Sequence, residues 1–142
     1  MKHSIPVQLR FNDTDALGHV NNSTYFSFYD LGKTEYFRAL YGDNYFTKEI
    51  DIVVAHAEVD FIEPVFLTDD ISVETSVTHI GSKSFSLYQQ IRDNRTNHVK
   101  CKCTTIMVGY DFKNKITIPI SDEWRKVIAD YEERPDFLDN EK

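Results

Sequence analysis

The order of two hydrophobic periods along the chain restricts its fold more than any other feature. Between Asn22 and Gly42, apolar residues recur at three- and four-residue spacing. This pattern predicts one helix of about 20 residues, roughly 30 Å long. Between residues 55 and 110 the period falls to two, which predicts four hairpin-linked strands. A long helix followed by an antiparallel sheet belongs to the α+β class.

Individual residues predict where these elements begin and end. Asn21 or Asn22 is suited to cap the start of the long helix, and Gly42 is suited to stop it. Gly32, in the middle of that helix, predicts a close approach to the sheet because it has no side chain. One more strand is expected ahead of the helix, so the strands expected are residues 5–11, 55–61, 71–77, 85–91 and 99–110.

A short second helix is expected near the C-terminus. Ser121 is placed to cap it, and Arg134-Pro135 is placed to end it. Its apolar stripe is predicted to consist of Trp124, Val127, Ile128 and Tyr131. The length of 142 residues suits a single domain over residues 1–142, with residues 135–142 as a loose acidic tail.

Charge and hydropathy exclude several kinds of partner. The net charge is −7, from 16 basic and 23 acidic residues, which argues against general binding of nucleic acid. No stretch approaches the roughly 20 apolar residues that a membrane-spanning helix needs. The start of the chain lacks the apolar segment of a signal peptide, so we expect a cytoplasmic protein without membrane insertion.

The cysteines and histidines do not predict a metal site. Cys101 and Cys103 are two residues apart in an expected strand, so they share one face and are expected to be half-buried free thiols. His56 and Glu58 match the first half of a zinc-deaminase signature, but the required Pro-Cys-x-x-Cys is missing. We therefore expect no metal and no bound cofactor.

The segment DTDALGHVNN, residues 13–22, carries the chemistry that a site would need. It delivers carboxylates to the start of the long helix, where unpaired N–H groups can hold a developing oxyanion. An aspartate there can act as general base or nucleophile. A thiol leaves readily as thiolate, so such a site suits thioesters better than amides. The alternative is a structural loop, because Asp and Asn are common in caps and turns.

At these residues the chain resembles a known family. DTDALGHVNNSTYFSFYDLGKTEYF and AHAEVDFIEPVFLTDDISVETSV look like segments of the hotdog-fold acyl-CoA thioesterases of the 4-hydroxybenzoyl-CoA thioesterase type. The resemblance implies a curved antiparallel sheet of about five strands wrapped around the long helix. It also implies hydrolysis of acyl-CoA by a homodimer or homotetramer whose active site lies at the subunit interface.

The resemblance assigns roles by position. Asp15 matches the catalytic carboxylate, and Asn22 matches the residue whose backbone N–H polarises the thioester carbonyl. His19 matches a histidine of related acyl-carrier-protein thioesterases, which usually carry Asn where this chain has Leu17, so its role is either local hydrogen bonding or catalysis. Asp13 is expected to be a cap or turn residue.

The substrate-binding residues follow from the same resemblance. Tyr25 is expected in the pocket wall or the core, and Lys83 and Ser84, on a predicted hairpin, match residues that contact the phosphates of coenzyme A. Lys83 can equally be a solvated turn residue. Two other functions stay open: a hotdog hydratase or dehydratase, and a non-hydrolytic acyl-thioester binding module.

Overall fold

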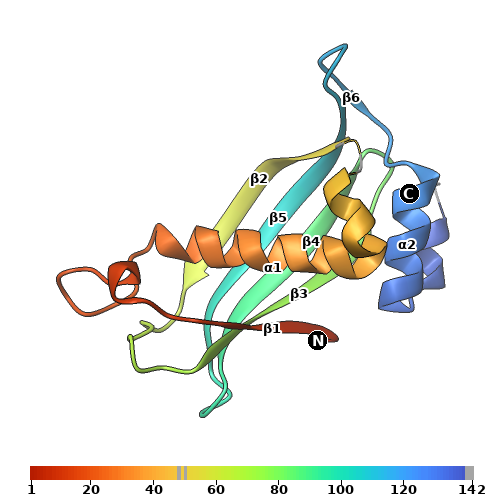
Figure 1. The fold of residues 1–142 in the computed structure, drawn as a ribbon. Helices are drawn as coiled ribbons and strands as arrows, with labels where there is room; N and C mark the ends of the chain where they lie inside the picture. The colour runs from red at the N-terminus through yellow and green to blue at the C-terminus, as the bar shows by residue number, and fades with distance from the viewer. Residues whose placement is uncertain (48, 50, 140–142) are drawn as a thin grey trace. The chain divides into compact units, whose positions relative to one another are not determined.

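The computed structural model describes residues 1–47, 49 and 51–139 (Figure 1). The helices are α1 (Thr24–Tyr41) and α2 (Asp122–Glu132), with short 3₁₀ helices at Phe11–Asp13, Gly42–Thr47 and Pro135–Leu138. The strands are β1 (His3–Val7), β2 (Ile52–Phe61), β3 (Ile71–Ile80), β4 (Ser84–Asp93), β5 (Val99–Asp111) and β6 (Ile116–Ile118). This content confirms the predicted α+β class.

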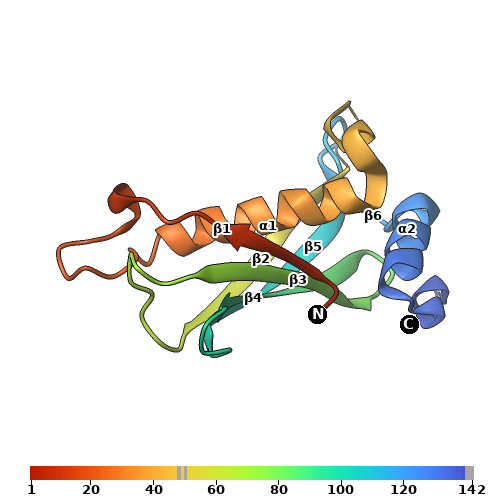
Figure 2. The ribbon, with the colours of Figure 1, turned by 60° about the horizontal axis from the view of Figure 1, so that its bottom comes forward.

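The strands form one sheet in the order β1-β3-β4-β5-β2, and β6 pairs with β5. β1 runs antiparallel to β3, with Ile5 opposite Val73, and Figure 2 shows the two strands side by side. Pro6, which has no N–H to donate, is tolerated because β1 lies at the edge of the sheet.

Two details of the strand prediction are wrong. The first strand ends at Val7 rather than Phe11, because Phe11–Asp13 turn into a 3₁₀ helix. The prediction of about five strands omitted β6, whose three residues are too few to show a period.

The chain divides into two compact units. The first consists of Met1–Tyr36, Val59–Thr75 and Gln89–Cys103, and the second of Phe37–Glu58, Ser76–Tyr88 and Thr104–Lys142. The expectation of a single domain stays a prediction.

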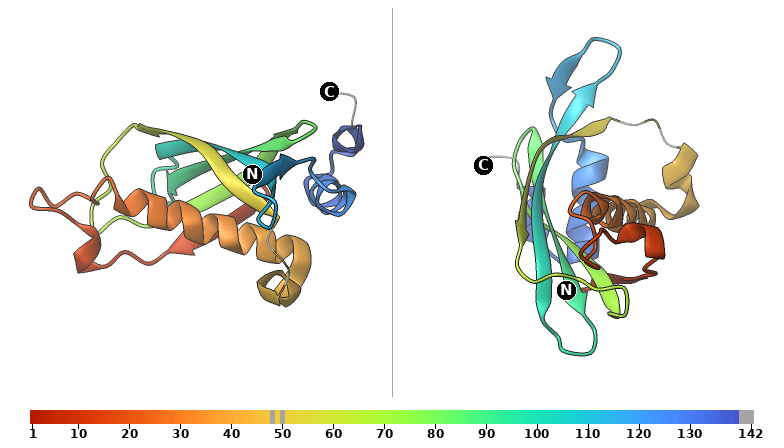
Figure 3. Two further views of the ribbon diagram at one scale, coloured as in Figure 1. Left: turned by 90° about the horizontal axis from the view of Figure 1, so that it is seen from above. Right: turned by 90° about the vertical axis from the view of Figure 1, so that its left-hand side faces the viewer.

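In the first unit, the part of α1 up to Tyr36 lies against one side of the strands (Figure 3). A Cβ atom on Gly32 would stand 2.9 Å from both Val73 Cγ1 and Gln89 Nε2, which confirms the predicted close approach to the sheet. Gln89 Nε2 also donates to the Tyr29 carbonyl at 2.9 Å. The core of this unit consists of Val7, Val20, Tyr25, Phe28, Tyr29, Val65, Ile71, Val73, Ile91, Cys101 and Cys103.

In the second unit, α2 begins as predicted. Ser121 Oγ accepts a hydrogen bond from Trp124 N at 3.2 Å. The helix ends at Glu132, and Glu133 adopts the left-handed conformation that often closes helices. The stripe prediction was partly wrong, because the buried residues are Trp124, Arg125, Ile128 and Ala129.

The segment after α2 is more ordered than the sequence suggested. Pro135–Leu138 form a 3₁₀ helix, and Phe137 is 4% exposed. The Phe137 carbonyl accepts a hydrogen bond from Arg125 Nη1 at 3.1 Å. The expectation of a loose tail is therefore wrong for these residues, and residues 140–142 lie outside the described part of the chain.

Two further expectations concern burial and membranes. Cys101 and Cys103 are free thiols on one face of β5, but both are fully buried rather than half-buried. No helix among the described residues is long and apolar enough to cross a membrane.

Candidate active site

The segment between β1 and α1 folds into a small hairpin. Thr14 and Val20 form an antiparallel bridge, and Asp15 N donates to the His19 carbonyl at 2.8 Å. The turn closes at Gly18, whose φ of +78° lies in the left-handed region that glycine adopts without strain. Backbone pairing therefore fixes the ten residues that the sequence singled out.

A second set of backbone contacts anchors this hairpin to the connection between β2 and β3. Val20 N donates to the Val65 carbonyl at 2.8 Å, and His19 forms an antiparallel β-bridge with Phe66. The segment that carries Asp15 and the segment that follows β2 are thus held side by side, although they lie some forty-five residues apart in sequence.

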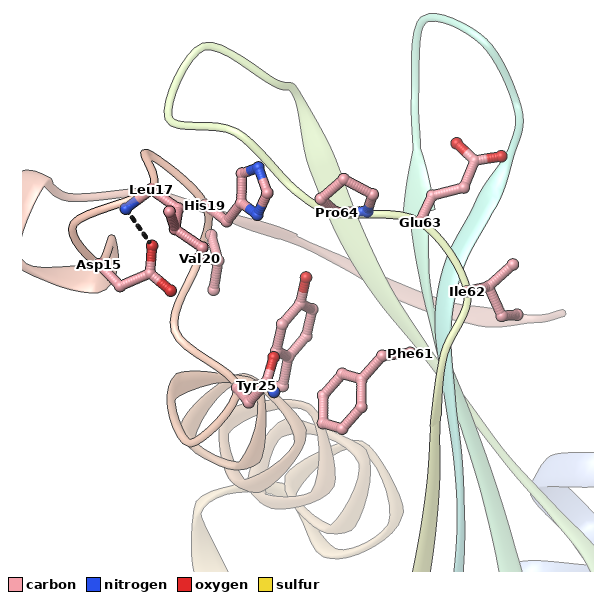
Figure 4. A pocket seen from close by; sticks show the side chains of 10 residues that line it. Asp15, Leu17, His19, Val20, Tyr25, Phe61, Ile62, Glu63 and Pro64 are labelled. Carbon is pink, nitrogen blue, oxygen red and sulfur yellow. Dashed lines mark hydrogen bonds between the residues drawn. The ribbon is translucent and has the colours of Figure 1, made fainter.

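Asp15 is exposed and uses one carboxylate oxygen locally. Its Oδ1 accepts a hydrogen bond from Leu17 N at 2.9 Å, as Figure 4 shows. Within the described part of the chain, Oδ2 has no hydrogen-bond partner. The turn orients the carboxylate and leaves one oxygen free to accept a proton or to attack.

The start of α1 separates the roles of the two asparagines. Asn21 is the capping residue, since its Oδ1 accepts from Ser23 N at 3.0 Å and its carbonyl accepts from Thr24 N at 2.9 Å. The backbone N–H of Asn22 has no acceptor among the described residues. It is one of the unsatisfied donors that a helix start offers.

A pocket of about 360 Å³ lies between these elements. Asp15, His19, Asn22 and Tyr25, all predicted from the sequence, line it together. Figure 4 shows the hairpin on one side and the segment of residues 61–64 on the other, with the Phe61 ring turned toward Tyr25. The residues that the prediction did not place there are Leu17, Val20, Phe61, Ile62, Glu63 and Pro64.

Tyr25 belongs to both the core and the pocket wall. It is 2% exposed, and its ring meets that of Phe61 edge-on with a centroid separation of 5.3 Å. Burial raises the pKa of Tyr25 to about 12, although a hydrogen bond with the Val65 backbone opposes the rise. The hydroxyl is therefore neutral near pH 7 and can orient a substrate but is poorly suited as a base.

The remaining polar residues of the hairpin have more local contacts. Asp13 Oδ2 accepts a hydrogen bond from Arg10 N at 2.8 Å, which confirms the predicted capping role. The His19 ring packs edge-on against Phe66 at 5.0 Å. Since His19 also lines the pocket, both interpretations of its role remain compatible with its position.

Comparison with known proteins identifies the family of this chain. The model of the thioesterase-like superfamily matches residues 9–129. The chain belongs to the thioesterase-like superfamily. This membership confirms the resemblance found in the hairpin and strand segments.

Two curated proteins named as CoA thioester hydrolases are similar to this chain in sequence. A 1,4-dihydroxy-2-naphthoyl-CoA hydrolase of Crocosphaera subtropica is 29% identical over 74% of this chain and 80% of its own length. The acyl-CoA thioester hydrolase YbgC of Escherichia coli is 28% identical over 61% of this chain and 66% of its own. The chain spans between 55% and 80% of the lengths of the curated relatives considered.

The fold is also that of a solved thioesterase. A Thermus thermophilus thioesterase, solved in complex with coenzyme A and Zn, superposes with a TM-score of 0.83 at 28% identity. The match covers 95% of this chain and 99% of that one. The predicted hotdog fold is thereby confirmed.

Two predicted substrate contacts of this thioesterase-like chain lie elsewhere. Lys83 and Ser84 sit at the turn between β3 and β4 in the second unit, and neither lines the pocket. The side chain of Lys83 is exposed, and its carbonyl accepts from Gly109 N at 3.0 Å. Among the described residues, no group of three His, Cys, Asp or Glu side chains is arranged to hold a metal ion.

Proposed function

We propose that the protein hydrolyses acyl-CoA thioesters to a free acid and coenzyme A, and that the reaction occurs in the pocket beside Asp15. The observation that carries this proposal is that Asp15 and Asn22 line the same pocket. Among the described residues, Asp15 has a carboxylate oxygen without a hydrogen-bond partner, and Asn22 has a backbone N–H without an acceptor. The names of superfamily relatives that act on CoA thioesters support the substrate class.

The proposed chemistry divides the work between these two groups. The Asn22 N–H donates to the thioester carbonyl oxygen and stabilises negative charge as it develops there. The Asp15 carboxylate either removes a proton from a water that attacks the carbonyl carbon, or attacks that carbon itself to form an anhydride that water then cleaves. In both routes the carbon–sulfur bond breaks, and coenzyme A leaves as thiolate.

The test is release of free thiol from a panel of saturated, unsaturated and aromatic acyl-CoAs at neutral pH. Hydrolysis liberates coenzyme A, whereas a hydratase alters the acyl chain without releasing thiol. A binding module neither releases thiol nor alters the acyl chain, but its binding changes the fluorescence of a labelled acyl-CoA. Absence of thiol release above buffer across the panel would refute the hydrolase proposal.

A labelling experiment separates the two roles of Asp15. In a single turnover in H₂¹⁸O with enzyme in excess, a general base sends ¹⁸O directly into the released acid. If Asp15 is a nucleophile and water attacks the aspartyl carbonyl of the anhydride, the acid leaves with an oxygen of Asp15 and the label is found on Asp15. Attack of water on the acyl carbon would put the label in the acid, as general-base catalysis does. Label on the peptide that contains residue 15, measured by mass spectrometry, therefore identifies the nucleophilic route.

We further propose that the working form is at least a homodimer that pairs through β2. This strand lies at the edge of the sheet, and Val54, Ala55, His56, Ala57 and Glu58 are all exposed. An unpaired edge with accessible backbone groups is a ready site for pairing with another strand. Phe61, the last residue of β2, also lines the pocket.

A further inference from the structure

We infer that Lys100, which does not line the pocket, is a positioning residue that determines which acyl groups the pocket accepts. This inference rests on the proposed thioesterase function. It concerns the wall formed by residues 61–64, which faces Asp15 and Tyr25 across the pocket (Figure 4).

Lys100 is hydrogen-bonded to three consecutive residues of this wall. Its backbone carbonyl accepts hydrogen bonds from both Ile62 N at 2.9 Å and Glu63 N at 3.0 Å. Its ammonium group donates to the Pro64 carbonyl at 3.2 Å. Three consecutive residues of the wall are therefore tied to one side chain and its own backbone.

Two carboxylates hold the ammonium group of Lys100 in a fixed position. Lys100 is 8% exposed, and its Nζ lies 3.3 Å from Asp69 Oδ2 and 3.7 Å from Asp93 Oδ2. Both carboxylates are themselves largely buried. A buried cation held by two carboxylates cannot exchange them for water without a large cost, so it fixes the Pro64 carbonyl more firmly than an exposed lysine would.

The same cluster of ion pairs is also linked to the hairpin, which forms the opposite wall of the pocket. Asp69 Oδ2 also accepts from Phe66 N at 2.9 Å, and Phe66 bridges His19 in the hairpin. The separation between the two walls therefore depends on one buried cluster of Lys100, Asp69 and Asp93. Close packing transmits a displacement in such a cluster to the side chains that rest on it.

This placement predicts an effect on selectivity rather than on the chemical step. Asp15 is oriented by Leu17 N and by its own hairpin, and the Asn22 N–H belongs to the turn that leads into α1. Neither group is bonded to Lys100 in the described structure. Loosening residues 61–64 moves the Phe61 ring, which contacts Tyr25, and changes the space for the acyl group, while the carboxylate and the N–H stay in place.

The experiment compares kcat/KM for hexanoyl-CoA and benzoyl-CoA in wild type, Lys100→Met, Lys100→Arg and the matched control Lys102→Met, which removes an exposed lysine from the same strand. The ratio of the two values does not depend on the fraction of folded enzyme. In Lys100→Met we expect this ratio to change by about tenfold, the size typical of a misplaced pocket wall. Lys100→Arg, which keeps the charge, should restore part of the ratio, and Lys102→Met should leave it unchanged.

Lys100→Met leaves two buried carboxylates without their cation, so a second variant guards against a failure to fold. Asp69→Asn keeps an acceptor for Phe66 N but removes one charge, and we expect the ratio to shift in the same direction. An unchanged ratio in either folded variant, with only a lowered Tm, would overturn the positioning role. A wild type without thiol release would instead refute the proposed function on which this role rests.

Discussion

Asp13 and Asp15 are two residues apart, yet their carboxylates have different hydrogen-bond partners. The Asp13 carboxylate accepts from Arg10 N and closes a 3₁₀ turn. The Asp15 carboxylate accepts from Leu17 N with one oxygen and keeps the other oxygen free within the described structure. An asparagine can replace the acceptor in both places, but it cannot act as a base or nucleophile.

We expect Asp15→Asn to lower kcat on the best acyl-CoA by a factor of about 10² to 10⁴, the usual contribution of a general base. Asp13→Asn should alter kcat far less, because an amide oxygen can still accept from Arg10 N. Melting temperatures of both variants serve as the folding control. Equal rates for wild type and a folded Asp15→Asn would refute the role of Asp15, and a larger loss from Asp13→Asn would transfer it to Asp13.

The sequence predicted part of this site for a local reason. Asp15, His19, Asn22 and Tyr25 lie within eleven residues, so a hairpin followed by a helix brings them together wherever the segment packs. The wall at residues 61–64 could not be predicted in this way. It faces the hairpin only because residues 19–20 pair with residues 65–66, and nothing in either period specifies such a long-range bridge.

At the scale of elements, the contact between α1 and the sheet depends on one missing side chain. The Gly32 backbone lies so close to the sheet that an added Cβ would stand 2.9 Å from Val73 Cγ1 and Gln89 Nε2. The two hydrophobic periods revealed the helix and the major strands, and Gly32 revealed the close approach. They could not reveal β6 or the early end of β1, which depend on local turns of three or four residues.

We expect Gly32→Ala to lower the free energy of unfolding by about 1–3 kcal/mol, the usual cost of overpacking a tight contact. The gain in helix propensity from Gly to Ala, roughly 1 kcal/mol, acts in the opposite direction but is smaller than a severe clash. Ser27→Ala, at an exposed position of the same helix, is the matched control and should not destabilise. Urea unfolding decides the matter, and a Gly32→Ala variant as stable as wild type would show that the helix can shift.

Glu74 on β3 makes stability depend on acidity. Burial alone would raise the pKa of this carboxyl, but hydrogen bonds from Gln90 at 2.6 Å and Arg92 at 2.8 Å outweigh it and hold the pKa below its ordinary value. A folded-state pKa that is lowered stabilises the protein above the unfolded value of 4.5. That contribution is lost as the pH falls below 4.5 and through the folded-state pKa.

We therefore expect Glu74→Gln to reduce the dependence of the unfolding free energy on pH below 4.5. The same substitution should lower the free energy of unfolding at neutral pH. The measurement is urea unfolding at a series of pH values from neutral to acid. Glu58→Gln, at an exposed position of β2, is the control and should keep the slope of wild type. An unchanged slope in Glu74→Gln would mean that other carboxyls carry the acid sensitivity.

At the scale of the whole molecule, the open question is assembly. One edge of the sheet is β2, whose residues 54–58 are exposed, and the proposed site lies at the end of that strand.

We expect light scattering at micromolar concentration to give at least twice the 16.6 kDa of one chain. Ala57→Glu, which adds a charge to the exposed edge strand, should lower that mass and reduce thiol release together. Ser27→Glu adds the same charge to an exposed position of α1 and should leave the mass unchanged. A monomeric wild type with full activity would contradict the proposed homodimer as the working form.

The burial of the two cysteines has a practical consequence for measuring this protein. Cys101 and Cys103 are 0% and 3% exposed, and burial raises the pKa of the Cys101 thiol to about 11. The thiolate is the reactive form, so the native protein should be nearly silent toward a thiol-reactive dye. A dye that follows released coenzyme A would then have no background from the enzyme. The same dye would report unfolding, because both thiols of each chain become reactive when the strand is exposed.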